Sequence, residues 1–147
     1  MKSKHQTIKL VMLVGDSTEA NYINKKVIEI SGFAEVILTK SSMESAIDYL
    51  RENEALRSSL PEIIFLDISH PISGHLEFLD TFEQSTETVK ESSKIMIFSN
   101  SLSAHEIDEL LEKKSVVGYI SKPLLVEKLK TLKSSYLKAP HKKQRIN

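Results

Sequence analysis

Five short apolar runs recur along the chain at intervals of about 20 to 30 residues, and a segment with helical periodicity follows each of them. The runs are Ile8–Val14, Ala34–Leu38, Glu62–Leu66, Lys94–Phe98 and Val116–Ile120. Short apolar runs bounded by turn residues are typical of strands buried on both faces of a parallel sheet. The run at 34–38 alternates between apolar and polar residues, so we expect it at an edge. The pattern predicts an α/β fold with helices on both faces of a parallel sheet.

Five helices are expected after these strands. Their ranges are Thr18–Ile30, Met43–Leu50, Gly74–Phe82, Ser103–Leu111 and Leu124–Leu137. In the first helix, the apolar side chains that share a face are Tyr22, Ile23, Val27 and Ile30. Ser103 and Glu106 have the spacing of a capping box, which marks a helix start. The polar segment Glu83–Ser93 is expected to be a loop.

The composition fits one cytoplasmic domain that does not enter a membrane. A chain of 147 residues, 40% hydrophobic and 27% charged, can bury a single core. No stretch approaches the roughly 20 consecutive apolar residues that cross a bilayer. The apolar run Leu10–Val14 near the basic start is shorter than the about 7–15 residues of a secretory signal. The chain has no cysteine, which excludes disulfides, thiolate metal sites and thiol nucleophiles.

Charge is balanced overall but unevenly spread. The last ten residues contain four basic residues and no acidic one, so the remaining chain has 20 acidic and 16 basic residues. A mildly acidic body argues against a DNA-binding face. We therefore expect a domain over residues 1–137, followed by a basic, disordered tail over residues 138–147.

Four residues that carry chemistry follow the predicted strands. Asp16, Asp67, Ser99 and Lys122 each stand at or just beyond the end of an apolar run. Each of them alone is ordinary in a turn, a cap or a solvated surface. In an open parallel sheet, however, ligands bind beyond the carboxyl ends of the strands. Together the four predict a pocket with two carboxylates, a hydroxyl and an ammonium.

Three segments around these residues have a recognisable pattern. Ile63–Gly74 reads IIFLDISHPISG, an apolar strand with Asp67 at its end, a Pro four residues later and a Gly three beyond it. Tyr119–Pro123 contains Lys-Pro with an aromatic residue three positions before the Lys, and Ser99 ends another strand. Together they resemble the receiver domain of two-component response regulators, over about residues 8–134. The resemblance implies a doubly wound, five-stranded, flavodoxin-like parallel sheet in the order 2-1-3-4-5.

The resemblance assigns a phosphoryl-transfer role to this pocket. Asp67 would accept a phosphoryl group from a phosphohistidine on a partner. Mg²⁺ would neutralise the charge, held by Asp16, Asp67 and the main-chain carbonyl of Ser69. Lys122 would pair with a phosphoryl oxygen.

The resemblance also implies a switch. The Ser99 hydroxyl would bond a phosphoryl oxygen, pull the following loop inward and let Tyr119 change rotamer. The phosphoryl donor would be a sensor histidine kinase or a histidine phosphotransfer protein. The output would be binding to a downstream protein, or relay of the phosphoryl group. Such a chain is a signalling phosphoprotein and not an enzyme, apart from slow self-dephosphorylation.

The chain departs from the family pattern at two positions. The family usually has two adjacent acids after the first strand, whereas this chain has Gly15 before Asp16. The missing acid normally reaches the metal through water, so we expect Mg²⁺ binding to be weakened. Glu19 is a candidate substitute carboxylate. His70 stands where the family commonly has Met. It either faces solvent, tunes the lifetime of the acyl phosphate or binds another metal.

Three other functions compete with a phosphorylated receiver. A degenerate receiver would act as a phosphate-independent interaction module, which the loss of the acid at Gly15 favours. A haloacid-dehalogenase-type enzyme would need a second Asp two residues after Asp16, where Thr18 stands instead. A flavodoxin-like flavin binder would need a phosphate loop rich in Ser, Thr and Gly, and Gly15–Thr18 only faintly matches it.

Overall fold

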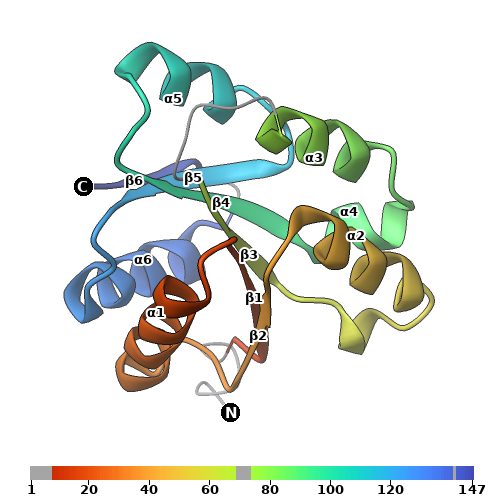
Figure 1. Cartoon of the computed structure of the whole chain (residues 1–147), viewed down its shortest axis with the longest axis horizontal. Helices are drawn as coiled ribbons and strands as arrows, with labels where there is room; N and C mark the ends of the chain where they lie inside the picture. The colour runs from red at the N-terminus through yellow and green to blue at the C-terminus, as the bar shows by residue number, and fades with distance from the viewer. Residues whose placement is uncertain (1–7, 69–73, 141) are drawn as a thin grey trace.

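The computed structural model describes residues 8–68, 74–140 and 142–147, which form one twisted parallel sheet covered by helices (Figure 1). Within these residues the sheet has six strands in the order β2-β1-β3-β4-β5-β6. The strands are β1 (Leu10–Val14), β2 (Val36–Lys40), β3 (Ile63–Asp67), β4 (Lys94–Ser99), β5 (Val116–Ser121) and β6 (Gln144–Ile146). All neighbouring pairs are parallel. The predicted α/β class and the order of the first five strands are confirmed, whereas the sixth strand was not expected.

The helices lie in two layers. They are α1 (Thr18–Ser31), α2 (Met43–Glu52), α3 (Gly74–Glu83), α4 (Glu87–Ser92), α5 (Ala104–Leu111) and α6 (Val126–Lys138), with a 3-10 turn at Arg57–Ser59. Figure 1 shows α1 and α6 on one face of the sheet and α2, α3 and α5 on the other. In the part of the chain that the structure describes, each helix is too short or too polar to span a bilayer.

Two local predictions about helices have opposite outcomes. The capping box at the start of α5 is confirmed, because Ser103 Oγ accepts from the N–H of Glu106 and the Glu106 carboxylate accepts from the N–H of Ser103. The loop expected over 83–93 is wrong, because α4 forms within it. The Thr86 side chain caps α4 by accepting from the N–H of Val89, and the Val89 side chain is buried in the core. An apolar anchor and a cap, together with the bonds of Arg57 to Glu91 and Ser92, therefore stabilise a short helix in an otherwise polar segment.

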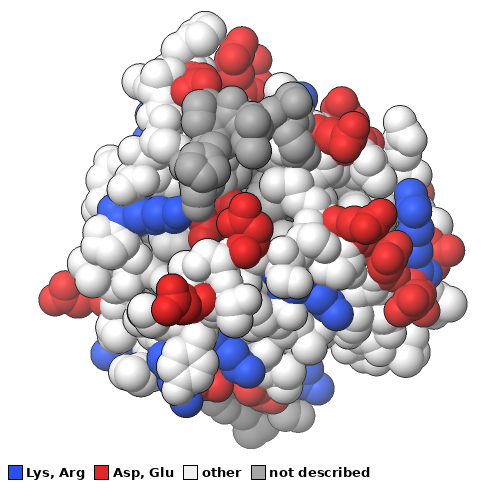
Figure 2. All heavy atoms as spheres, in the orientation of Figure 1, with Lys and Arg blue, Asp and Glu red and all other residues white. Residues whose placement is uncertain are grey.

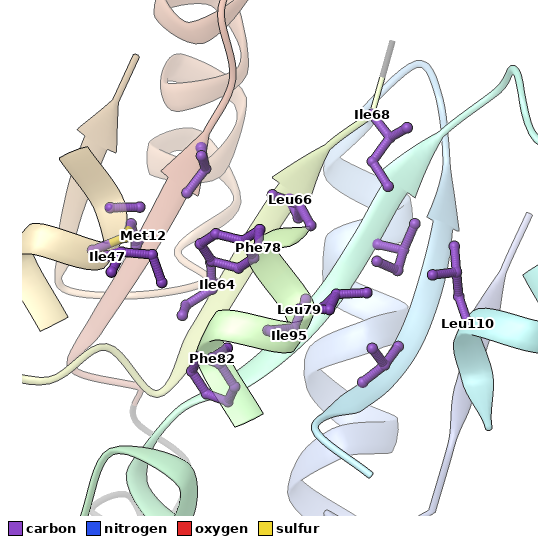
Figure 3. Packing of buried hydrophobic residues seen from close by; sticks show 14 of the residues in the cluster. Met12, Ile47, Ile64, Leu66, Ile68, Phe78, Leu79, Phe82, Ile95 and Leu110 are labelled. Atoms are coloured by element: carbon purple, nitrogen blue, oxygen red, sulfur yellow. The ribbon is translucent and has the colours of Figure 1, made fainter. Parts of the chain in front are cut away.

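The apolar strands are buried on both faces, as their continuous hydrophobicity predicts. Ile64 and Leu66 of β3 pack on the face covered by α2, α3 and α5, where Phe78 and Phe82 of α3 lie against them (Figure 3). Phe65, which stands between them in the sequence, packs in a second cluster under α1 and α6. Alternate residues of one strand thus serve two cores, and the sheet holds the strand ends in fixed register.

Helix α1 faces the sheet with a different side from the one that its apolar residues suggest. Tyr22, Ile23 and Ile30, expected to pack inward, are exposed. The fully buried positions are Asn21 and Ile28, which stand two helical turns apart and therefore share a face. The helix consequently turns a polar amide toward the carboxyl end of β1.

The C-terminal segment joins the sheet instead of forming the disordered tail expected over residues 138–147. Strand β6 pairs in parallel with β5, and Arg145 forms an ion pair with Asp108 of α5 at 2.5 Å. Gly118 of β5 makes this approach possible, because a Cβ at that position would collide with the main-chain oxygen of the first residue of β6. Backbone pairing with β5, the ion pair of Arg145 and the packing of Ile146 against the core under α1 and α6 hold this segment.

Candidate functional site

Asp67 and Lys122 meet at the carboxyl edge of the sheet. Asp67 is the last residue of β3, and Lys122 directly follows β5. The Nζ atom of Lys122 lies 2.6 Å from Oδ1 of Asp67, and the two side chains are 21% and 4% exposed. Strand β4 lies between β3 and β5 in the sheet, so these side chains meet across the end of β4. The structure therefore brings together the carboxylate and the ammonium that were expected to share a pocket.

The surroundings of this ion pair are partly apolar. The Lys122 ammonium also lies 5.4 Å from the centroid of the Phe98 ring, on the strand between them. An ammonium above an aromatic face is attracted by the ring's quadrupole. A charge pair that is mostly removed from water interacts more strongly than one on an open surface. The ammonium thus offsets the negative charge of a carboxylate that has little contact with solvent.

The Ser99 hydroxyl is fully buried at the end of β4, next to Asp67. Its Oγ donates a hydrogen bond to the carbonyl of Ile68 at 2.6 Å and accepts one from the N–H of Ser101 at 3.1 Å. The main-chain carbonyl of Ser99 accepts from the N–H of Lys122 at 3.3 Å. The serine thus contacts both the segment that follows Asp67 and the residue that pairs with it.

Tyr119 is joined to the same strand end. Its side chain is buried, and its hydroxyl donates to the main-chain carbonyl of Ser99 at 2.8 Å. Burial raises the pKa of Tyr119, and the positive charge of Arg145 opposes that rise. The ring packs in the core cluster on the α5 side of the sheet. The predicted switch residues are therefore in direct contact.

The end of β1 contributes two further features. Asp16 is exposed beyond β1, and Glu19 is exposed in the first turn of α1. Gly15 stands beside Asp67, because a Cβ built on Gly15 would lie 3.2 Å from Cβ and from Oδ2 of Asp67. The same Cβ would lie 2.6 Å from Oδ1 of Asn21. The side chain of Asn21 therefore fills the space that a side chain at position 15 would need.

Asn21 was not identified from the sequence. Its amide is 4% exposed, and Nδ2 donates to the Gly15 carbonyl at 2.7 Å. Its Oδ1 has no hydrogen-bond partner among the described residues. The apolar residues of α1 favour the opposite side of the helix, and nothing in the sequence pattern points to Asn21.

The oxygen atoms at this edge suit a hard divalent cation. Mg²⁺ prefers oxygen ligands and is usually held by one or two carboxylates together with other oxygens. The carboxylates of Asp67 and Asp16 and the buried Oδ1 of Asn21 provide such oxygens. Figure 2 shows acidic side chains near the middle of the face that it presents. Nowhere in the described part of the chain do three His, Cys, Asp or Glu side chains gather around one point. Among the described residues, the buried amide oxygen of Asn21 is thus available in addition to the carboxylates. Ser69, expected to bind the metal through its main-chain carbonyl, and His70 lie outside the described residues.

Comparison with solved structures identifies proteins of the same architecture. A two-component response regulator from Cytophaga hutchinsonii is 30% identical, with a TM-score of 0.78 over 90% of this chain and 98% of that chain. A response regulator receiver protein from Dyadobacter fermentans is 19% identical, with a TM-score of 0.73 over 88% and 96%. A chemotaxis response regulator of Vibrio cholerae is 20% identical, with a TM-score of 0.60 over 87% and 98%. No protein-family model and no curated protein matches the sequence.

Proposed function

Because this chain belongs to the receiver-domain family of two-component response regulators, we propose that it accepts a phosphoryl group on Asp67 and thereby changes its binding to another protein. The 2.6 Å contact between Asp67 and Lys122 carries this proposal. It puts a carboxylate that can act as a nucleophile next to a cation that can pair with the oxygens of the incoming phosphoryl group.

In the proposed transfer, a carboxylate oxygen of Asp67 attacks the phosphorus of a phosphohistidine. The P–N bond breaks, and its electron pair returns to the imidazole of the donor. The product is an acyl phosphate on Asp67. Mg²⁺, when bound, neutralises charge on the carboxylates and on the phosphoryl oxygens. Positioning and charge neutralisation are what phosphoryl transfer mainly requires from a protein, and Lys122 and the rigid end of β3 supply both.

The contacts of Ser99 support a switch that follows phosphorylation. Its hydroxyl now bonds the carbonyl of Ile68, and its own carbonyl accepts from Tyr119. If the hydroxyl turns to a phosphoryl oxygen, the loop after β4 moves with it and the acceptor of Tyr119 shifts. The change then reaches the surface formed by α5, β5 and α6, where a downstream protein binds.

The partners follow from the chemistry. The phosphoryl donor is a sensor histidine kinase or a histidine phosphotransfer protein, because a phosphohistidine readily transfers its phosphoryl group to a carboxylate. The acceptor of the signal is a protein that recognises the altered surface, or a second histidine in a relay. Gly15 removes one acid from the cation site, so Mg²⁺ binding is expected to be weaker than in receivers that have both acids.

The test is intact mass after incubation with acetyl phosphate, with and without Mg²⁺. Wild type should gain one phosphoryl group in the presence of Mg²⁺, and Asp67→Asn should gain none. Asp48→Asn is a matched control, since Asp48 is an exposed carboxylate on α2. An adduct that persists in Asp67→Asn would overturn the assignment of the site. A folded wild type without any adduct would favour a phosphate-independent interaction module, the function that the missing acid at Gly15 supports.

A further inference from the structure

Asn21 has its amide group oriented by the backbone of the β1–α1 turn. Its Nδ2 donates to the carbonyl of Gly15 at 2.7 Å. Because a carbonyl only accepts hydrogen bonds, the amide nitrogen must face it, and the amide cannot be reversed without setting two acceptors against each other. The oxygen Oδ1 is therefore fixed on the other side of the amide.

This oxygen borders the same space as the carboxylate of Asp67. A Cβ built on Gly15 would be 2.6 Å from Oδ1 of Asn21 and 3.2 Å from Oδ2 of Asp67, so both oxygens face the position that a side chain at 15 would occupy. Asn21 is only 4% exposed, and Oδ1 has no donor among the described residues. A buried acceptor that lacks a donor destabilises the folded chain. Such an oxygen beside a carboxylate can bind a cation directly, or accept a hydrogen bond from a water molecule bound to the cation.

Gly15 and Asn21 are sterically matched. Any residue with a Cβ at position 15 would meet Oδ1 of Asn21 at a distance that real side chains do not adopt. The glycine is therefore what allows the amide to reach the edge of Asp67. The departure from the family pattern at Gly15 is thus an exchange, in which an acid from the end of β1 is replaced by an amide from α1.

We propose that Asn21 takes the place of the missing acid, with Oδ1 accepting a hydrogen bond from water on a divalent cation that Asp16 and Asp67 bind. This inference rests on the proposed function, because it assigns Asn21 to the same cation site. An amide is uncharged, so the site has one negative charge fewer than a site with two adjacent acids. It therefore binds Mg²⁺ with lower affinity than such a site, but an oxygen of Asn21 stands in for the oxygen of the missing acid.

The test measures Mg²⁺ binding to the full chain by isothermal titration calorimetry, without any phosphoryl donor. Asn21→Leu keeps the branched shape of the side chain but removes Oδ1, and it should raise the Kd about tenfold or more, as the loss of an outer-shell partner does. Asn24→Leu, a half-buried asparagine on the same helix, is the matched control and should leave the Kd within roughly twofold.

A second variant separates cation binding from a purely structural role. Asn21→Asp keeps an oxygen and adds a charge, but it loses the N–H that bonds the Gly15 carbonyl. We expect it to lower the free energy of unfolding without metal and, at the same time, to bind Mg²⁺ more tightly than wild type. A residue that only supported the turn would lower stability and leave the Kd unchanged. This variant decides the question even if Asn21→Leu does not fold.

The outcomes distinguish this inference from the proposed function. If wild type binds Mg²⁺ and Asn21→Leu binds it equally well, Asn21 has no part in the site, while Asp67 keeps its role as phosphoacceptor. Weaker binding by folded Asn21→Asp would also overturn the inference. If wild type binds no Mg²⁺ at all, the inference fails, and the mass experiment with Asp67→Asn decides separately whether the chain is phosphorylated.

Discussion

The hydroxyl of Ser99 donates a 2.6 Å hydrogen bond to the main-chain carbonyl of Ile68, the residue that directly follows Asp67. The hydroxyl that we propose to hold a phosphoryl oxygen is therefore already bonded to the segment that carries the phosphoacceptor. A hydroxyl has one proton to donate, so it cannot serve both acceptors. The exchange from Ile68 to the phosphoryl group gives this residue two discrete positions, which is what a switch requires.

Ser99→Ala should separate phosphorylation from the response to it. We expect Asp67 to be phosphorylated in this variant, and partner binding to lose its dependence on phosphate. The free energy of unfolding should fall by about 1–3 kcal/mol, because the Ile68 carbonyl loses its donor and the N–H of Ser101 loses its acceptor. Urea unfolding measures the stability, and Ser134→Ala is the control because Ser134 is exposed on α6, away from the strand ends. Equal stability of the two variants would show that the bond to Ile68 contributes nothing.

Removing the ammonium of Lys122 should destabilise the folded chain. Lys122→Gln removes the ammonium next to the largely buried Asp67 carboxylate. Because Lys122 is partly exposed, the loss should be smaller than for a fully buried ion pair, and we expect the free energy of unfolding to fall by about 1–3 kcal/mol. Lys130→Gln, on the exposed side of α6, should change the free energy of unfolding little. In an Asp67→Asn background the effect of Lys122→Gln should shrink. If it does not shrink, the ion pair is not the cause of the destabilisation.

The sequence is sufficient to predict that these groups meet. Parallel strands all end at one edge of a sheet, so residues that follow the strands converge whatever their separation along the chain. For that reason the five apolar runs alone predict that Asp67, Ser99 and Lys122 lie together. In the structure, Lys122 pairs with Asp67 and donates its N–H to the Ser99 carbonyl, and the Ser99 hydroxyl bonds the residue after Asp67.

Asn21 and β6 could not be predicted in the same way. The periodicity of α1 offers an apolar face that includes Ile23 and Ile30, and only the packed structure shows that the helix turns its other side inward. Strand β6 is three residues long and contains one apolar residue, so it has no hydrophobic signal. Its position depends on Gly118 of β5, because a side chain there would collide with β6. The sequence of β6 itself therefore contains no sign of this pairing.

Gly118→Ala should displace β6 from the edge of the sheet. The added methyl group would collide with the main chain of Gln144 and would lie 3.0 Å from Sδ of Met96. We expect the free energy of unfolding to fall by about 1–3 kcal/mol, as overpacking usually causes. In a chain that lacks residues 142–147, the same substitution should be less harmful, and urea unfolding of the four variants gives the coupling. Additive effects would mean that Gly118 does not make room for β6.

Tyr136 should make the protein less stable at alkaline pH. Burial, together with the charge and the hydrogen bond of Glu62, raises the pKa of Tyr136 from 10.0 to about 12. Between these values the unfolded chain releases the phenolic proton and the folded chain retains it, so the free energy of unfolding falls as the pH rises from 10.0 to about 12. The contribution is fully present below pH 10.0. Tyr136→Phe should unfold with a weaker dependence on pH over this window, and an unchanged dependence would contradict the assignment.

Substitutions at Gly15 should depend on what occupies position 21. Gly15→Ala puts a methyl group 2.6 Å from Oδ1 of Asn21, so it should lower the free energy of unfolding by about 1–3 kcal/mol. In an Asn21→Ala background the obstructing oxygen is absent and most of that loss should disappear, although the contacts at 3.2 Å with Asp67 remain. Urea unfolding of the single and double variants measures this coupling.

The same background tests the exchange of an acid for an amide directly. Gly15→Asp combined with Asn21→Ala returns a carboxylate to the end of β1 and removes the amide that took its space. This double variant should bind Mg²⁺ more tightly than wild type by calorimetry, because it adds a negative charge next to Asp67. Gly15→Asp alone should be less stable than the double variant, since its side chain and that of Asn21 compete for one volume. A single variant that is as stable as wild type would show that the two positions do not share that space.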